Sequence, residues 1–322
     1  MISTKVSITR SPFIHAFASV RPADKALLFL SYDTPHADAA CGGPNKASSI
    51  MAFRPREAPQ GSPALNVMRA AAMKAGKTLL RDFGEVEALQ VSQKGPADFV
   101  TAADVKVEKI LREELERARP GYCFVMEEGG MIEGPDKSHR WYIDPIDGTT
   151  NFIHSLPQFA ISIGLEREGQ LVAGVVYAPV LNEFFWAEKG KGAWLNDKRL
   201  RVAGRKKLSE CIFATGIPFA EKAGHETFLS ELASVMKRTA GVRRFGAASL
   251  DLAYVAAGRF DGFWERGLKP WDIAAGTLLV REAGGLVTDE AGSNDVINAA
   301  AVITANIDLH PELMKVLALA RT

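Results

Sequence analysis

The stretch WYIDPIDGTTNF, residues 141–152, guides the interpretation of the whole sequence. It opens with apolar residues typical of a strand, and Asp144 and Asp147 follow at once. Two carboxylates at the end of a strand can converge on one point above the edge of a sheet. Pro145 fixes φ and Gly148 permits a tight backbone, and both are also common in turns. Taken alone, the stretch therefore leaves a turn and a functional site as alternatives.

Three other acidic stretches have equally ordinary explanations when each is considered separately. Residues 127–130 (EEGG) follow an apolar strand pattern and fit a solvated loop. Residues 271–276 (WDIAAG) place Asp272 at the start of a helix, where Asp is a preferred N-cap. Residues 101–104 (TAAD) have the spacing of a capping box, with Asp in place of the usual Glu.

Considered together, these carboxylates point to a metal site. Glu127, Asp144 and Asp147 each follow a strand, and Asp272 opens a helix after a strand, a common place for a site in an α/β sheet. Two carboxylates about 4 Å apart repel by roughly 4 kcal/mol at an effective dielectric of 20, so convergence requires a cation. Oxygen ligands without His or Cys favour Mg²⁺ or Mn²⁺ over Zn²⁺. Such an acidic cage suits phosphate chemistry.

Composition narrows the class of protein. The 322 residues include 39 Lys and Arg against 38 Asp and Glu, and this net charge of +1 argues against nucleic-acid binding through bulk charge. Cys41, Cys123 and Cys211 fit no zinc pattern and predict a reduced, cytoplasmic protein. No apolar run reaches the roughly 18 residues of a membrane span, and no clean signal peptide is expected.

The chain divides into three parts by composition. Residues 1–62 are rich in proline and are expected to form a flexible extension, or a translation-start artefact if Met51 or Met68 begins the chain. Residues 63–207 are predicted to be an α+β metal-binding half. Residues 208–322 alternate strand and helix and are predicted to be an α/β substrate-side half.

Hydrophobic periodicity predicts the elements of both halves. Apolar residues at helical spacing share one face at Val107, Ile110, Leu111 and Leu115. Helices are expected at residues 65–83, 101–118, 226–237, 247–257, 272–283 and 311–320, and strands at 122–126, 140–143, 160–166, 171–177, 184–188, 211–215, 242–244, 260–264 and 302–305, with a hairpin turn near Gly169.

The combination of motifs resembles the inositol monophosphatase family of Mg²⁺-dependent, Li⁺-sensitive phosphatases, and most of all its bacterial inositol-1-monophosphatases. Residues 141–152 and 271–276 carry the resemblance, in this order and at this spacing. Residues 97–104, 127–128 and 246–248 support it, and it spans about residues 64–320. The resemblance implies a layered αβαβα fold, which is an α+β and α/β arrangement, together with a homodimer.

The resemblance also implies the metal ligands. Glu127, Asp144 and the carbonyl of Ile146 would hold a first Mg²⁺. Asp144, Asp147 and Asp272 would hold a second, and Glu127 would face a third with waters. One departure stands next to this set, because Met126 occupies a position where the family usually has Gly. A positive φ there would strain Met126 and displace Glu127.

Catalytic and substrate roles follow from the same resemblance. Thr149, paired with Asp104, would orient and deprotonate the attacking water. Backbone N–H groups of Gly148 and Thr149 would face the phosphate. Gly246, Ala248 and Glu265 would contact an inositol ring.

The predicted function is hydrolysis of the small-molecule phosphomonoester inositol-1-phosphate to inositol and phosphate. Three other substrates leave the chemistry unchanged, namely fructose-1,6-bisphosphate, histidinol phosphate and a nucleotide 3′-phosphate. A phosphatase-fold protein that binds RNA or a transcription partner is a further alternative, although no membrane or nucleic-acid partner is expected. Its candidate surface is the basic run of Arg199, Arg201, Arg205, Lys206 and Lys207.

Overall fold

The computed structural model describes most of the chain after residue 59. The predicted extension therefore lies, up to that residue, outside the described residues, and the division at residue 207 stays a prediction. None of the described helices is both long enough and apolar enough to cross a membrane. The described residues are 60–83, 91–95, 98–218, 223–299 and 301–321.

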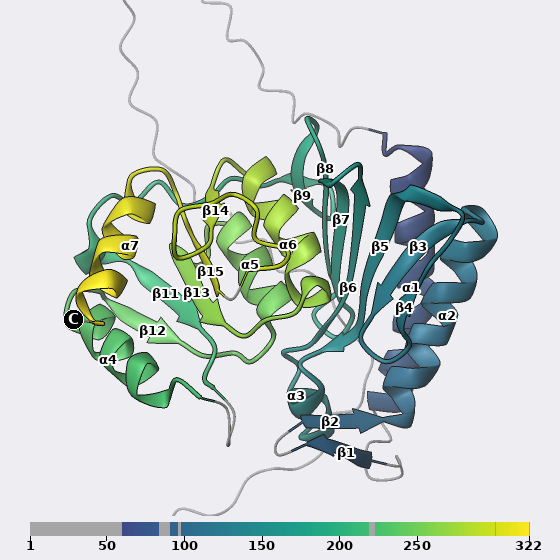
Figure 1. The fold of residues 1–322 in the computed structure, drawn as a ribbon, viewed down its shortest axis with the longest axis horizontal. Helices are drawn as coiled ribbons and strands as arrows, with labels where there is room; N and C mark the ends of the chain where they lie inside the picture. Colours follow the sequence, from purple (N-terminus) through teal and green to yellow (C-terminus); the bar gives the residue numbers. More distant parts are fainter. Residues whose placement is uncertain (1–59, 84–90, 96–97, 219–222, 300, 322) are drawn as a thin grey trace, which may run out of the picture. The chain divides into compact units, whose positions relative to one another are not determined.

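An eight-stranded sheet forms the first β layer, in the order β10-β9-β8-β7-β6-β5-β3-β4 (Figure 1). Only β3 and β5 pair in parallel. Glu168 and Gly169 both have positive φ and close the β6–β7 hairpin, which confirms the predicted turn. The strands are β3 (Tyr122–Met126), β4 (Gly130–Ile132), β5 (Asp136–Asp147), β6 (Ala160–Arg167), β7 (Gln170–Ala178), β8 (Glu183–Glu188), β9 (Gly192–Leu195) and β10 (Lys198–Arg199).

A five-stranded sheet forms the second β layer, in the order β12-β11-β13-β15-β14. β11 pairs in parallel with both β12 and β13, so the carboxyl ends of these three strands meet at one edge. β15 runs antiparallel to β13 and β14. The strands are β11 (Ile212–Thr215), β12 (Gly241–Arg243), β13 (Gly262–Arg266), β14 (Leu286–Thr288) and β15 (Ala301–Ala305).

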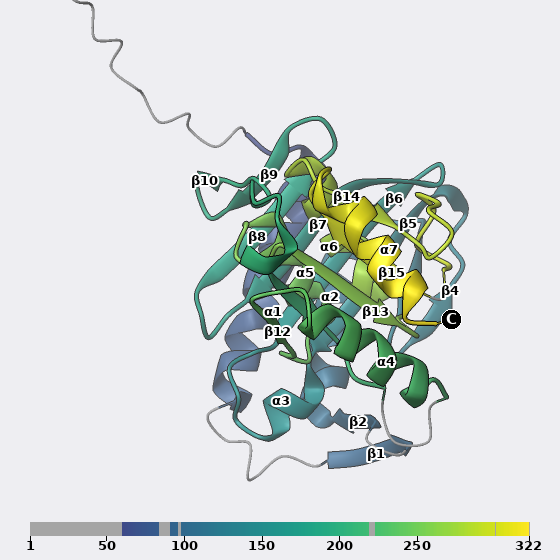
Figure 2. The same ribbon diagram turned by 90° about the vertical axis from the view of Figure 1, so that its left-hand side faces the viewer.

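Helices complete five layers (Figures 1 and 2). α1 (Pro63–Phe83) and α2 (Ala102–Ala118) cover the outer face of the first sheet, and α4 (His225–Met236) and α7 (Leu309–Leu319) pack together on the second. α5 (Ala248–Ala256) and α6 (Pro270–Glu282) lie between the sheets. Every residue of α5 is buried, as expected for a mostly apolar helix that packs between two sheets. This arrangement confirms the predicted αβαβα fold.

The outer helices bury the faces that the periodicity indicated. Val107, Leu111 and Leu115 are fully buried against the first sheet, and Ile110 packs at the margin of the same cluster. The elements missing from the prediction are short, which leaves them too few residues to show a period. They are the two-stranded ribbon β1 (Val91–Gly95) and β2 (Asp98–Thr101), the strands β4, β9, β10 and β14, the helix α3 (Thr149–Ile153) and a 3₁₀ turn (Leu208–Glu210).

Candidate active site

The carboxyl end of β5 brings two carboxylates to one side of the sheet. Its pairing with β6 becomes irregular between Asp144 and Asp147, where three steps along β5 oppose two along β6. In a regular strand, residues three apart point to opposite faces, and the extra residue of this bulge removes that conflict. Both carboxylates consequently line the same cleft. The predicted strand 140–143 is thus too short, because β5 continues through Pro145 to Asp147.

Gly148 turns the chain directly after the strand. Its φ is 95°, and a Cβ here would lie 2.9 Å from the carbonyl oxygen of Gln158 and 3.3 Å from that of Gly246. Only glycine accepts this conformation and this close approach without strain. Asn151, from the short helix that follows, donates from Nδ2 to the carbonyls of Gln158 and Phe245, both at 2.7 Å. The turn therefore joins the β5 stretch to the residues that precede α5.

Thr149 and Asp104 form the predicted pair. The hydroxyl of Thr149 lies 3.2 Å from Oδ1 of Asp104 and 3.0 Å from the carbonyl oxygen of Ile146. Oδ2 of Asp104 accepts hydrogen bonds from the backbone N–H and the hydroxyl of Thr101, which confirms the capping box. Burial raises the pKa of Asp104 to about 6, against the hydrogen bonds from Thr101 that lower it. Asp104 thus caps α2 with one oxygen and contacts Thr149 with the other.

Asp147 binds the first turn of α5. Its Oδ1 accepts the N–H of Ala248 at 3.2 Å, and its Oδ2 accepts the N–H and the hydroxyl of Ser249 at 2.7 and 2.5 Å. These N–H groups have no partner within the helix, so the carboxylate satisfies them. Burial raises the pKa of Asp147, while the bonds from Ser249 and Ala248 lower it. Ser249 was not among the predicted site residues.

Asp272 lies in the first turn of α6 but does not begin the helix. The helix starts at Pro270, and Oδ2 of Asp272 accepts the N–H of Lys269 at 2.7 Å. The predicted helix 272–283 and the N-cap interpretation of Asp272 are wrong by two to three positions, because Lys269 is the cap residue. Ser162 donates to the carbonyl of Trp271 at 3.1 Å and ties this turn to β6.

Glu127 follows β3 without the strain that Met126 would cause at positive φ. The non-glycine residues with positive φ in the described ranges are Ser155, Glu168, Asn182 and Asn196, so Met126 does not meet the condition. Met126 ends β3 and is buried in the core that α1 and α2 form with the first sheet. The N–H of Glu127 donates to the carbonyl of Ile143 at 3.2 Å, which holds the two strand ends together.

A cleft of about 450 Å³ gathers nearly the whole predicted site. It lies where the β5 stretch, the first turns of α5 and α6, and the ends of β11 and β13 meet. Asp104 does not line it and contacts it through Thr149. The predicted residues that line it are Glu127, Asp144, Ile146, Asp147, Gly148, Thr149, Gly246, Ala248, Glu265 and Asp272. Their individual roles remain predictions.

The acidic side of the cleft is dominated by like charges. Oδ1 of Asp144 accepts the N–H of Ile146 at 2.9 Å. Burial, followed by the nearby charges of Glu127, Asp147 and Asp272, raises the pKa of Asp144 well above its usual range. A hard divalent cation would relieve this repulsion, and an all-oxygen donor set suits Mg²⁺. In the described ranges no three His, Cys, Asp or Glu side chains already stand in a ligand arrangement.

Several residues of the cleft escaped the sequence prediction. Arg244, Lys269 and Gly216 line it. Asp251 of α5 is buried beside it, and its Oδ1 has no hydrogen-bond partner within the described part of the chain. Burial, together with the charges of Glu265 and Asp147, raises the pKa of Asp251 well above its usual range. A charged residue inside the apolar pattern of α5 was the available signal for Asp251.

Known proteins share both the sequence and the fold. An inositol-1-monophosphatase of Caulobacter vibrioides is 58% identical over 251 residues, which cover 77% of this chain and 98% of that protein. The Nus factor SuhB of Pseudomonas aeruginosa is 46% identical over 248 residues, covering 76% and 92%. The crystal structure of the extragenic suppressor protein SuhB from Bartonella henselae matches with a TM-score of 0.77 and 55% identity, covering 80% and 98%.

The family profile completes this comparison. The inositol monophosphatase family matches residues 61–321, which include every predicted site residue. Together with the relatives, this match confirms the predicted phosphatase, a phosphoric monoester hydrolase. The carboxylates, the αβαβα layers and the relatives agree, and the chain belongs to the inositol monophosphatase family.

Proposed function

We propose that this phosphatase hydrolyses inositol-1-phosphate, with Mg²⁺ held by Glu127, Asp144, Asp147, Asp272 and the carbonyl of Ile146. The observation that carries the proposal is that Glu127, Asp144, Asp147 and Asp272 line one cleft, where burial, followed by the neighbouring charges, raises the pKa of Asp144. Mg²⁺, when bound, supplies the positive charge that stabilises the phosphate oxygens and promotes loss of a proton from water.

Thr149 and Asp104 would position the attacking water. The Thr149 hydroxyl lies between Asp104 and the carbonyl of Ile146, so it can donate to either and accept a hydrogen bond from a water in the cleft. An Asp104 carboxyl with a pKa near 6 is ionised at neutral pH and can accept the proton that Thr149 passes on. Gly148 would place its backbone N–H, with that of Thr149, toward the phosphate.

Glu265, Gly246 and Ala248 would contact the alcohol part of the substrate. Glu265 lines the same cleft as the acidic cluster. A carboxylate is a hydrogen-bond acceptor for hydroxyl groups, which suits a polyol such as inositol. It also suits the amine of histidinol phosphate, so substrate choice has to be measured directly.

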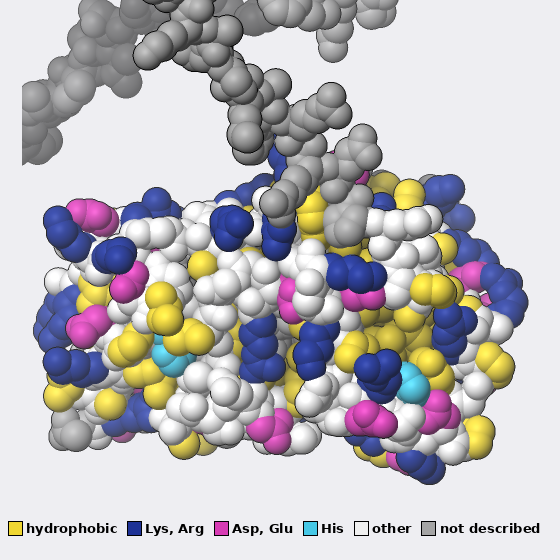
Figure 3. Space-filling model, turned by 90° about the horizontal axis from the view of Figure 1, so that it is seen from above, with side chains coloured by type: hydrophobic (Ala, Val, Ile, Leu, Met, Phe, Trp, Pro, Cys, Tyr) yellow, Lys and Arg dark blue, Asp and Glu magenta, His cyan; other side chains and the backbone are white. Residues whose placement is uncertain are grey.

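A separate role in binding RNA or a transcription partner finds little support in the basic run. Arg205 pairs with Asp261 at 2.7 Å, Lys206 with Asp308 at 3.2 Å, and Lys207 with Glu210 at 3.5 Å. Seen from above, Lys and Arg side chains are spread between acidic and apolar ones rather than gathered in one patch (Figure 3). Some relatives are named Nus factors, and this name is the reason to test the second role. Salt-dependent RNA binding that survives Asp144→Asn would support it.

The test of the main proposal is phosphate release with and without Mg²⁺. The substrates are inositol-1-phosphate, fructose-1,6-bisphosphate, histidinol phosphate and adenosine 3′,5′-bisphosphate. We expect inositol-1-phosphate to lead by about tenfold or more in kcat/KM, which equals about 1.4 kcal/mol of transition-state preference. Asp144→Asn should abolish turnover, and Asp197→Asn, on the exposed β9–β10 turn, is the matched control.

Two results would overturn this assignment. If another phosphoester leads the panel, the proposed substrate is wrong although the chemistry stands. If Mg²⁺ supports no turnover of any of them, the metal assignment is wrong as well. We also expect a cytoplasmic homodimer and inhibition by Li⁺, which light scattering and the same phosphate assay would test.

A further inference from the structure

Glu265 and Gly216 stand side by side at the ends of two parallel strands. Thr215 of β11 pairs with Trp264 of β13, so the next residues along the two strands are Gly216 and Glu265. Both line the cleft, Gly216 buried and Glu265 half-buried. The two residues therefore form one wall of the cleft.

The space above Gly216 is filled by the carboxyl group of Glu265. A Cβ built on Gly216 would overlap Cδ and both carboxylate oxygens of Glu265, and these are the three atoms nearest to it. No backbone atom is among them. The missing side chain of Gly216 thus leaves room for the carboxyl group of Glu265, and a methyl group would have to displace that group.

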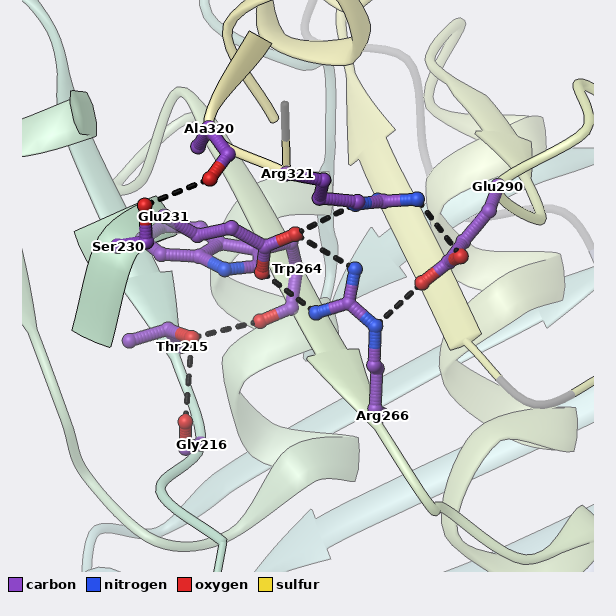
Figure 4. A network of polar contacts seen from close by, with 9 residues as sticks. All are labelled: Thr215, Gly216, Ser230, Glu231, Trp264, Arg266, Glu290, Ala320 and Arg321. Carbon is purple, nitrogen blue, oxygen red and sulfur yellow. Dashed lines mark hydrogen bonds and ion pairs between the residues drawn. The ribbon is translucent and has the colours of Figure 1, made fainter. Parts of the chain in front are cut away.

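The two residues that flank Glu265, Trp264 and Arg266, are held by polar contacts (Figure 4). We therefore expect the side chain of Glu265 to move rather than the strand. The hydroxyl of Thr215 lies 2.8 Å from the carbonyl of Trp264 and 3.2 Å from that of Gly216. On the other side, Arg266 forms ion pairs with the carboxylates of Glu231 and Glu290. These contacts fix the strand before and after Glu265.

Alanine is conformationally acceptable at position 216. The glycines with positive φ in the described ranges do not include Gly216, so a Cβ adds no backbone strain there. Gly216→Ala should consequently fold, with the Glu265 carboxylate rotated away from its present place. This separates Gly216 from Gly148, where any side chain strains the backbone itself.

We propose that Gly216 is a positioning residue, whose missing side chain keeps the Glu265 carboxylate against the strand end and thereby sets the preference for polyol leaving groups. The inference rests on the proposed function, in which Glu265 contacts substrate hydroxyls. The specificity of the cleft then depends on both residues, because Glu265 contacts the substrate hydroxyls and Gly216 determines where the Glu265 carboxylate lies.

The test compares Gly216→Ala, Glu265→Ala and the double variant on inositol-1-phosphate and on phenyl phosphate, whose leaving group carries one oxygen and no further hydroxyls. Gly216→Ala should lose about tenfold more kcat/KM on inositol-1-phosphate than on phenyl phosphate, mainly through KM. The double variant should match Glu265→Ala, because the methyl group then has no carboxylate to displace. Gly204→Ala, at an open position without positive φ, is the matched control.

Different results overturn different parts of the proposal. If Glu265→Ala shows no selective loss on inositol-1-phosphate, the substrate contact in the proposed function is wrong and the inference falls with it. If Glu265→Ala is selective but Gly216→Ala is not, or if their losses multiply in the double variant, only the positioning role is wrong. Should Gly216→Ala fail to fold, adding Glu265→Ala should restore its thermal midpoint, and failure to do so also contradicts the role.

Discussion

Two groups of acidic side chains among the described residues differ in the charges that surround them. The Glu231 cluster carries its own counterions: Glu231 is fully buried, and its Oε1 accepts Arg266 at 2.6 Å and Arg321 at 2.9 Å. Glu290 completes it with ion pairs to both arginines (Figure 4). The cleft carboxylates, by contrast, are gathered with one another. They are Glu127, Asp144, Asp147 and Asp272.

The difference shows that burial of a carboxylate does not by itself mark a functional site. Two glutamates and two arginines sum to zero charge, so the Glu231 cluster is complete within the chain. It links α4 and the end of α7 to β13 and acts on structure. In the cleft, burial and the neighbouring carboxylates raise the pKa of Asp144, and a bound cation would favour its ionised form. Like charges are neighbours in the cleft, whereas opposite charges are neighbours in the Glu231 cluster.

The largest expected effect comes from Asp144→Asn. Because Asp144 is assigned to two metal positions, kcat/KM should fall by about a thousandfold or more, on the order of 4 kcal/mol. The neutral amide also removes one of the repelling charges, so thermal stability measured in EDTA should not decrease. Phosphate release and thermal melting measure the two effects. Activity near that of the unaltered protein, or a lower melting temperature in EDTA, would mean that Asp144 does not differ from Glu231 in the way proposed.

For Glu231→Gln we expect a loss of stability rather than a loss of activity. Removing the shared carboxylate leaves Arg266 and Arg321 without their main counterion, so the free energy of unfolding should fall by about 3 kcal/mol. Urea unfolding measures it, with the exposed Glu312→Gln on α7 as control. A change as small as that of the control would mean that the cluster adds no stability.

Asp104, at the edge of the cleft, should make the stability of the protein depend on pH. Burial raises its pKa from 3.8 to about 6 in the folded chain, so its contribution to stability is fully present below pH 3.8 and is lost as pH rises through 6. The stability of the unaltered protein relative to Asp104→Asn should therefore decline by about 2 kcal/mol between pH 4 and pH 7. Urea unfolding in EDTA across this range checks it. A flat difference would contradict the raised pKa.

The smallest effect is expected from deletion of residues 1–59. Both acidic groups are built from residues that follow, so melting temperature and kcat/KM should stay within error of the full chain. The deletion stops before Ser62 because Ser62 donates its N–H to Glu188 at 3.0 Å and accepts the N–H of Leu65 at the start of α1. A loss of activity would show that the N-terminal residues belong to the functional unit.

Much of the fold was predictable because the long elements carry clear periods. The strand at 122–126 and the buried face at Val107, Leu111 and Leu115 are confirmed. Two boundaries were not predictable. Proline normally interrupts a strand, but a bulge accommodates Pro145 within β5. Asp commonly caps a helix, but Lys269 is the cap residue of α6 in place of Asp272. Met126 was a similar case, because only the extended end of β3 removes the expected strain.

The donor chemistry could be predicted from residue types alone, since the carboxylates, hydroxyls and glycines that it needs occur at recognisable spacings. The layers could be predicted as well, because apolar periods specify which face of each element is buried. Which acids come together, and which are paired with arginines, became apparent from the packing of the folded chain. Glu231 gives no local signal that separates it from Glu127, yet α4 carries it to two arginines, whereas β3 carries Glu127 to other carboxylates. Charge compensation depends on distances between remote segments, and those distances exist only once the sheets and helices have packed.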